Sequence, residues 1–188
     1  MTKGDRTKKS ILEASRKLFA CKGFKDVSMS DICESTGLSR GGLYRHYSST
    51  EEIFIELITD SYSFDEQIEK RESALSILES TLRYVEDEIL HNENSMSLAI
   101  YEFANVGDNG RSFLTIEMKA KKRWERLIEY GMSTGEFLKV DAAAVAEMIL
   151  YYYQGLRMWS RVLRIDEAYA LHYRGNILSI LTGKRSGE

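Results

Sequence analysis

The segment SMSDICESTGLSRGGLYRHY, residues 28–47, decides how the rest of the chain is interpreted. Its first half predicts a short helix, because Ser28 can cap the start and Asp31 follows at the spacing of a capping box. Gly37 is placed to end that helix, since glycine readily adopts the left-handed conformation just past a helix end. Ser39 is a second cap, and a second helix is expected over Arg40–Tyr47. Two short helices joined by a four-residue turn with glycine predict a helix-turn-helix, whose second helix enters the DNA major groove.

The second helix has two different faces when its residues are placed at about 100° intervals. Leu43 and Tyr47 share one face and are expected to pack on the preceding helices. Two glycines at a helix start cost about 1 kcal/mol each relative to alanine. That cost is offset if a backbone without Cβ atoms approaches a phosphate or a base edge, although glycines near a helix end can also simply be tolerated. The residues on or beside the opposite face are Arg40, Gly41, Gly42, Tyr44 and Arg45.

A family resemblance rests on residues 11–57, and within them on LEASRKLFACKGFKDVSMSDICESTGLSRGGLYRHYSSTEEIF. This part, about a quarter of the chain, resembles the TetR family of bacterial transcriptional repressors. Apolar positions, glycines, caps and basic residues fall in one fixed order across three helices. The chain departs from the family pattern twice, with Gly42 where threonine is usual and Thr50 where lysine is usual. In the family both positions often contact DNA.

The helix faces and the resemblance together give the expected DNA contacts. Arg45 and Gly41 are expected to face base edges. The phosphates are expected to meet Ser28, Arg40, Tyr44, His46 and Thr50, and Ser39 and Gly42 complete the predicted set. Among the lysines of the first 25 residues, Lys8, Lys9, Lys17, Lys22 and Lys25 are candidates for further phosphate contacts.

Charge is distributed unevenly along the chain. Residues 1–50 hold 10 Lys/Arg against 5 Asp/Glu, and residues 51–188 hold 16 against 24, for a total of −3. A basic head on an acidic body is typical of a polyanion-binding module attached to a domain that DNA repels. The alternative is random scatter of surface charge. We therefore expect a DNA-binding domain over residues 1–50 and a second domain over residues 51–188.

Composition narrows the class of protein. A hydrophobic content of 43%, a charged content of 29% and the absence of proline are typical of a soluble, helical protein. No apolar run approaches the roughly 18 residues of a membrane span, and the polar N-terminus lacks a signal-peptide core, so we expect no membrane segment and a cytoplasmic protein. No cofactor, metal or catalytic motif is present, and two cysteines cannot form a disulfide framework. An enzyme is therefore not expected.

Apolar residues at spacings of three and four predict an all-α fold of about nine helices. The first six residues are expected to form a mobile basic arm. The expected helices span residues 7–22, 28–37, 40–47, 49–64, 73–91, 95–106, 112–133, 141–164 and 166–181.

The helix expected over residues 141–164 carries two adjacent apolar seams. One contains Val145, Ile149, Tyr152, Leu156, Trp159 and Leu163, and the other contains Ala144, Met148, Tyr151, Gly155, Met158 and Val162. A helix that faces only its own core needs a single stripe. The second seam predicts a two-fold homodimer through the last two helices, as the resemblance also implies. The alternative is one helix buried deep within a monomer.

The second domain is rich in aromatic residues, which are usually core residues but also line ligand cavities. The resemblance implies a small-molecule site there, with Tyr101, Trp124 and Tyr152 as the lining candidates. The expected protein is a ligand-responsive repressor, a dimer that reads a pseudo-palindromic operator. In the family, the fourth helix transmits the ligand state. Two alternatives are a DNA-binding protein without an effector, architectural or partner-recruiting, and a helical enzyme or carrier with a vestigial head.

Overall fold

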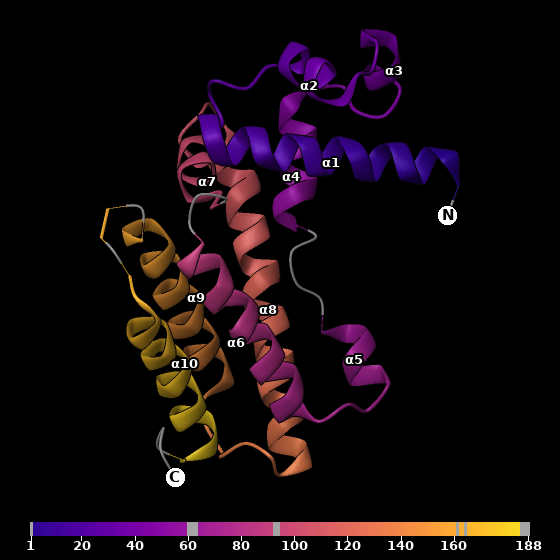
Figure 1. The fold of residues 1–188 in the computed structure, drawn as a ribbon. Helices are drawn as coiled ribbons and strands as arrows, with labels where there is room; N and C mark the ends of the chain where they lie inside the picture. Colours follow the sequence, from indigo (N-terminus) through magenta and orange to yellow (C-terminus); the bar gives the residue numbers. More distant parts are fainter. Residues whose placement is uncertain (1, 60–63, 92–94, 161, 164, 185–188) are drawn as a thin grey trace. The chain divides into compact units, whose positions relative to one another are not determined.

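The computed structural model describes residues 2–59, 64–91, 95–160, 162–163 and 165–184. In these residues all regular secondary structure is helical, which confirms the all-α prediction (Figure 1). Ten helices are described where nine were predicted, and the additional one is the five-residue α5, too short to show an apolar period. The helices are α1 (Lys3–Lys22), α2 (Met29–Thr36), α3 (Arg40–Tyr44), α4 (Thr50–Thr59), α5 (Asp65–Glu69), α6 (Ala74–Leu90), α7 (Ser97–Ala104), α8 (Asn109–Thr134), α9 (Ala142–Trp159) and α10 (Glu167–Thr182).

By their contacts the helices form two compact units, residues 1–61 with 96–116 and residues 62–95 with 117–188. Unit 1 contains α1–α4, α7 and the start of α8. Unit 2 contains α5, α6, the remainder of α8, α9 and α10. The contacts thus group α4 and α7 with the first three helices. The functional division expected after residue 50 stays a prediction.

The core of unit 1 is built around four phenylalanine rings. Phe19 lies in α1, Phe24 between α1 and α2, Phe54 in α4 and Phe103 in α7. The centroids of the contacting ring pairs lie 4.9–5.8 Å apart. All four side chains are buried, and each is worth roughly 1.5–3 kcal/mol of hydrophobic stabilisation. Helix α7 therefore shares one core with the helix-turn-helix segment.

Helix α1 starts earlier than the sequence analysis expected. The first six residues were predicted to be a mobile arm with the helix starting at Thr7, and that prediction is wrong. Thr2 is the N-cap, its hydroxyl accepts from the Asp5 N–H at 3.2 Å, and its own N–H donates to the Asp5 carboxylate at 2.7 Å. This capping box satisfies N–H groups that have no partner within the helix, so the polar start is helical.

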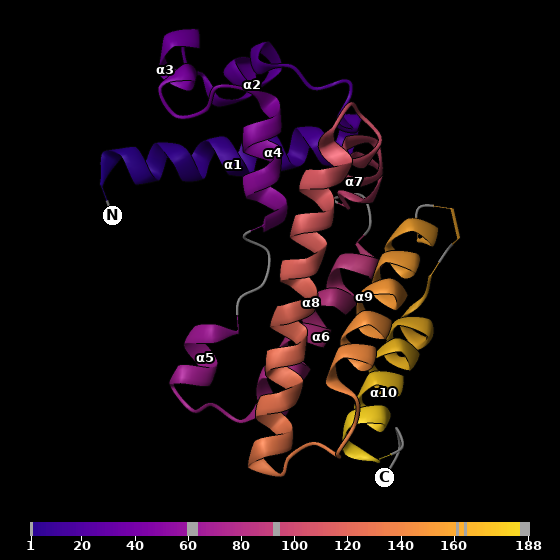
Figure 2. The ribbon, with the colours of Figure 1, turned by 180° about the vertical axis from the view of Figure 1, so that it is seen from behind.

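Unit 2 is a bundle of long helices in which α9 and α10 lie side by side (Figure 2). The predicted helix starts after residues 73, 141 and 166 are close to those observed, because Ser73, Asp141 and Asp166 are side-chain N-caps of α6, α9 and α10. Helix α9 ends at Trp159 rather than near residue 164, and residues 161 and 164 lie outside the described part. The predicted end of the fourth helix near residue 64 likewise crosses residues 60–63, which are not described, and α4 is defined to Thr59.

A single carboxylate joins the α8–α9 turn to the start of α6. The Glu136 carboxylate accepts from the backbone N–H groups of Ala74 and Leu75 at 3.0 and 3.1 Å. It also accepts from the hydroxyls of Ser73 and Thr134. Desolvation alone would raise the pKa of Glu136, but these four hydrogen bonds outweigh it and lower the pKa to about 2.

None of the described helices is both long and apolar enough to cross a membrane.

Candidate nucleic-acid interface

Helix α2 is held at its start by a capping box and a lysine. The Ser28 hydroxyl accepts from the Asp31 N–H and also donates to the Asp31 carboxylate, which in turn accepts from the Ser28 N–H at 2.9 Å. Lys22, at the end of α1, donates to the same carboxylate at 2.6 Å. These hydrogen bonds hold the pKa of Asp31 far below its usual range, and the bond from Lys22 has the largest effect. The predicted cap is confirmed, and the Ser28 hydroxyl is engaged within the motif.

The turn between the two helices has the predicted chemistry. Gly37 ends α2 with φ at +70°, a left-handed conformation that a side chain would strain. Leu38 is half-buried, and Ser39 caps α3 by accepting from the Gly42 N–H at 3.2 Å. Both ends of the turn are therefore fixed by short-range interactions.

Helix α3 presents one buried and one exposed face. Leu43 and Tyr47 are 0% and 2% exposed, as the helical spacing predicted. The exposed side carries Arg40, Gly41, Tyr44 and Arg45. Apart from the neighbouring residues and the backbone of α3 itself, no heavy atom of the described residues lies within 4 Å of the position a Cβ would take at Gly41, so its backbone is open.

Two expectations about α3 need correction. The helix spans only Arg40–Tyr44 instead of continuing to Tyr47, although Tyr47 still donates its N–H to the Leu43 carbonyl at 3.1 Å. Gly42 was expected on the side opposite Leu43, but it is buried, its N–H donates to the Ser39 hydroxyl, and a Cβ there would lie 3.3 Å from that hydroxyl. Its DNA contact stays a prediction. The spacing argument failed at Gly42 because the N-cap side chain folds over the first turn.

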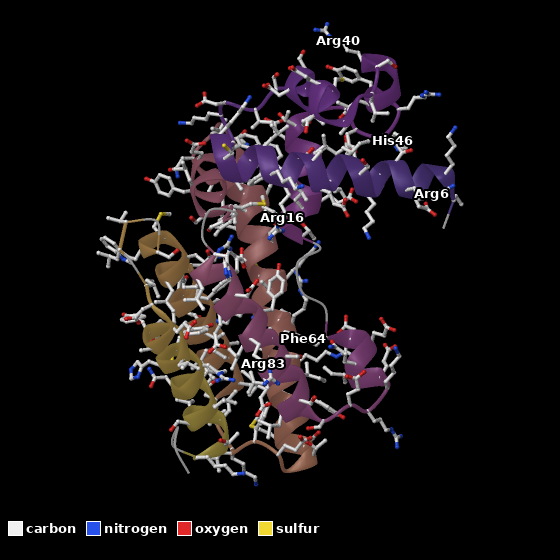
Figure 3. All side chains as sticks on the ribbon, in the orientation of Figure 1. Arg6, Arg16, Arg40, His46, Phe64 and Arg83 are labelled. Carbon is white, nitrogen blue, oxygen red and sulfur yellow. The ribbon has the colours of Figure 1, made fainter. Side chains whose placement is uncertain are left out.

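Figure 3 shows Arg40 and His46 on the helix-turn-helix segment, with Arg6 near the start of α1. Arg40 donates to the hydroxyl of Ser30 in α2 at 3.1 Å. His46 is half-buried, and Thr50, also half-buried, is the first residue of α4. The predicted DNA-contact residues between positions 39 and 50 thus lie on one short segment, and Ser28 lies at the start of the adjoining α2.

Sequence reasoning missed the contacts that hold Tyr47. The Lys8 ammonium lies 5.5 Å from the centre of the Tyr47 ring and pairs with the Glu56 carboxylate at 2.8 Å. Burial is the main cause that raises the pKa of Tyr47, and the nearby Glu56 carboxylate raises it further. These contacts join Tyr47, three residues after the end of α3, to α1 and α4. Lys8, a predicted phosphate candidate, is therefore engaged within unit 1, and no short-range pattern in the sequence signals that pairing.

The three ligand-lining candidates lie in different surroundings. Trp124 of α8 is 6% exposed and packs edge-on against Phe64 at 5.2 Å between ring centres. Tyr152 of α9 is half-buried and packs edge-on against Tyr173 of α10 at 4.8 Å. Both belong to, or pack on, the core of unit 2. Tyr101 of α7 is 60% exposed and belongs to unit 1, whereas the other two belong to unit 2, and the predicted ligand-binding role of all three stays a prediction.

Comparison with known proteins gives a family match that covers the helix-turn-helix. Residues 11–57 match the model of the bacterial regulatory proteins of the tetR family. The uncharacterized HTH-type transcriptional regulator YfiR of Bacillus subtilis is 30% identical over 164 residues, which cover 81% of this chain and 78% of YfiR. The HTH-type transcriptional repressor KstR2 of Mycolicibacterium smegmatis is 25% identical over 134 residues, 68% of this chain and 65% of KstR2.

Solved structures resemble nearly the whole chain. Full-length TylP, a TetR regulator from Streptomyces fradiae, superposes with a TM-score of 0.71 at 16% identity, over 96% of this chain and 89% of TylP. A TetR-family transcriptional regulator from Agrobacterium tumefaciens gives a TM-score of 0.68 at 18% identity, over 95% of this chain and 98% of that one. At these identities the likeness concerns the fold.

Proposed function

The chain belongs to the TetR family of bacterial regulatory proteins, and from this we propose that it is a ligand-responsive repressor that binds a two-fold operator as a homodimer. The family consists of transcriptional regulators with a DNA-binding helix-turn-helix, and not of enzymes. The repressor role, the dimer and the effector are the proposed parts. The proposed mechanism is a population shift, in which the effector favours a conformation whose two α3 helices no longer fit successive major grooves.

The observation that carries the proposal is the exposed side of α3. Arg40 and Tyr44 on α3 and Arg45 at its C-cap lie in solvent, and the opposite side of α3 is fixed in the core by Leu43. The open backbone at Gly41 lets α3 approach a groove closely. Arg45 and Gly41 are proposed to face base edges, and Arg40 and Tyr44 to meet phosphates. A short helix with arginines on its free side suits the major groove, where arginine pairs with guanine in two hydrogen bonds.

The ion pairs of unit 1 separate the basic residues into two groups. Lys8, Lys9 and Lys22 have carboxylate partners at 2.8, 3.9 and 2.6 Å. Within the described residues, no salt bridge engages Arg40 or Arg45. Binding DNA through these two arginines therefore requires no ion pair to be broken. Lys22 is proposed to support α2 rather than to meet a phosphate.

The dimer is proposed from the apolar surface of α9. In the second predicted seam, Met148, Tyr151, Met158 and Val162 are all exposed, and Trp159 lies beside them. Met148, Tyr151 and Met158 form one stripe at helical spacing along α9, and Val162 follows the end of the helix. An exposed apolar stripe of this kind marks an interaction surface. A second copy of the chain, packing α9 and the neighbouring α10 against their counterparts, would cover it and place two α3 helices in two-fold symmetry.

The effector is proposed to bind in unit 2, where Trp124 and Tyr152 come from two different helices of one apolar core. Its chemical class is proposed to be apolar or aromatic, because aromatic and aliphatic side chains dominate this core. Compounds of that class that bind should raise the melting temperature of the protein and release it from DNA. A second copy and an effector are separable parts of the proposal, because dimerisation is measurable without any compound.

The test is selection of duplexes from a random-sequence pool by the full-length wild-type protein. The proposal expects an enriched inverted repeat, because a two-fold dimer reads the same half-site twice. Enrichment of a single unrepeated site would contradict the dimer, and no enrichment at low salt would contradict sequence-specific binding altogether. The competing function, DNA binding without an effector, is supported if the repeat is enriched and no compound of the proposed class releases it.

A further inference from the structure

The turn between α1 and α2 determines where α2 begins and is held by a residue from far along the chain. Gly23 ends α1 with φ at +84°, and the segment after it leads directly to the N-cap of α2 at Ser28. The Lys22–Asp31 ion pair, at 2.6 Å, joins the two ends of this turn. Because α2 packs on α3, a shift of the turn would move the DNA-reading helix as well.

The carboxylate of Glu102 in α7 accepts hydrogen bonds from the backbone of this turn. One carboxylate oxygen of Glu102, Oε2, accepts from the Phe24 N–H at 2.7 Å and from the Lys25 N–H at 3.2 Å. Hydrogen bonds from backbone N–H groups to an ionised carboxylate are about twice as strong as those between neutral groups. A Cβ at Gly23 would lie 2.5 Å from the same oxygen. Glycine is therefore needed here both for its positive φ and for the close approach of the carboxylate.

The residue next to Glu102 holds the same turn through its side chain. The Phe103 ring lies 5.1 Å from the Phe24 ring and 5.0 Å from the Phe54 ring, measured between centroids. All three rings are buried. Consecutive residues of α7 thus fix Phe24 at both its backbone and its ring. A register shift or rotation of α7 would disturb both contacts together.

We propose that Glu102 is a positioning residue for DNA reading, which sets the α1–α2 turn and through it the placement of α2 and α3. The inference rests on the proposed function. It adds that the reading unit is completed by α7, outside the 11–57 segment that matches the family model. Glu102 acts through the turn, since a carboxylate has no attraction for phosphates.

Charge and positioning predict opposite effects when Glu102 is neutralised. Removing one negative charge from a DNA-binding unit strengthens DNA binding through electrostatics alone. Loosening the turn weakens binding to the preferred sequence, because α3 is no longer held at the angle that suits the groove. Glu34 provides a matched control, because it is an exposed glutamate on α2 within the same unit.

The experiment compares wild type, Glu102→Gln and Glu34→Gln for binding to a duplex selected by the wild type and to a random duplex. Glu102→Gln should bind the selected duplex about tenfold more weakly and the random duplex unchanged or slightly more tightly, so their ratio falls about tenfold. Glu34→Gln should bind both duplexes as tightly as wild type or more tightly. Equal behaviour of the two variants would overturn the positioning role. A purely structural role would lower the melting temperature but leave the ratio unchanged below it.

A second variant keeps the test decisive if Glu102→Gln fails to fold, as judged by helical circular dichroism. Glu102→Asp retains the charge but shortens the reach by one methylene group, so it should also lower the ratio, and an unchanged ratio would overturn the proposal. Hydrogen exchange of the Phe24 and Lys25 amides should be faster in either variant, and unchanged exchange counts against the inference. If the wild-type protein selects no duplex, the proposed function is overturned. If the wild type selects a duplex and the Glu102 variants bind it equally well, only the role of Glu102 is overturned.

Discussion

Replacing Glu136 with glutamine should make unit 2 less stable at neutral pH but not in acid. A carboxyl with a pKa of about 2 in the folded protein and 4.5 in the unfolded chain stabilises the fold by about 3 kcal/mol, at about 1.36 kcal/mol per pKa unit. Solvent screening at this partly exposed carboxylate reduces the expected value to about 2 kcal/mol. Because the folded pKa is depressed, this stabilisation is complete above about pH 5 and is lost as the pH falls through 4.5 toward 2.

The assay is urea unfolding of wild type and Glu136→Gln at a series of pH values. Tryptophan fluorescence suits it, because both tryptophans of the chain, Trp124 and Trp159, belong to unit 2. The difference in unfolding free energy should be about 2 kcal/mol at pH 7, should become small near pH 2 and should disappear below it, as the glutamate becomes protonated and resembles glutamine. A difference that stayed constant from pH 7 to pH 2 would refute the reasoning, because it would show that the hydrogen bonds of Glu136 do not favour its ionised form.

The remaining predictions concern DNA reading, the dimer and core packing. Arg45→Ala should cost about 1–3 kcal/mol in binding the selected duplex and relax sequence preference, as measured by electrophoretic mobility shift; equal losses on selected and random DNA would make Arg45 a phosphate contact. Met158→Asp should shift sedimentation velocity toward monomer, whereas the control Tyr84→Asp, on the exposed side of α6, should not. Gly131→Ala should destabilise unit 2 by about 1–3 kcal/mol in urea unfolding, because the added Cβ would lie 2.1 Å from the Phe137 ring; a stability equal to wild type would show that the ring moves freely.

Features with a short-range signal were predictable from the sequence. The caps at Ser28 and Ser39 and the left-handed Gly37 all occur where expected, because each depends on residues within four positions. The helix starts expected near Asp141 and Asp166 are likewise observed, and both residues are N-caps. The buried side of α3 followed from helical spacing alone. For the same reason, the all-α class could be predicted from apolar spacing and the absence of proline.

Features set by contacts between distant residues were not predictable. The Glu102 and Glu136 carboxylates bind backbone N–H groups more than 60 positions away, and no periodicity encodes such pairs. The sequence indicates no partner for Lys8, whereas the fold places the Glu56 carboxylate beside it. The helical start of α1 was missed for a different reason, since the Thr2–Asp5 capping box is local and could have been found.

The most direct test of the central claim is a hydroxyl-radical footprint of the full-length wild-type protein on its selected duplex. If two copies of α3 are held in neighbouring major grooves by a two-fold dimer, two protected patches should appear with their centres about one helical turn, 10–10.5 base pairs, or a whole number of turns apart. Each patch should weaken with Arg45→Ala. A single protected patch, or two patches unaffected by that substitution, would contradict the account.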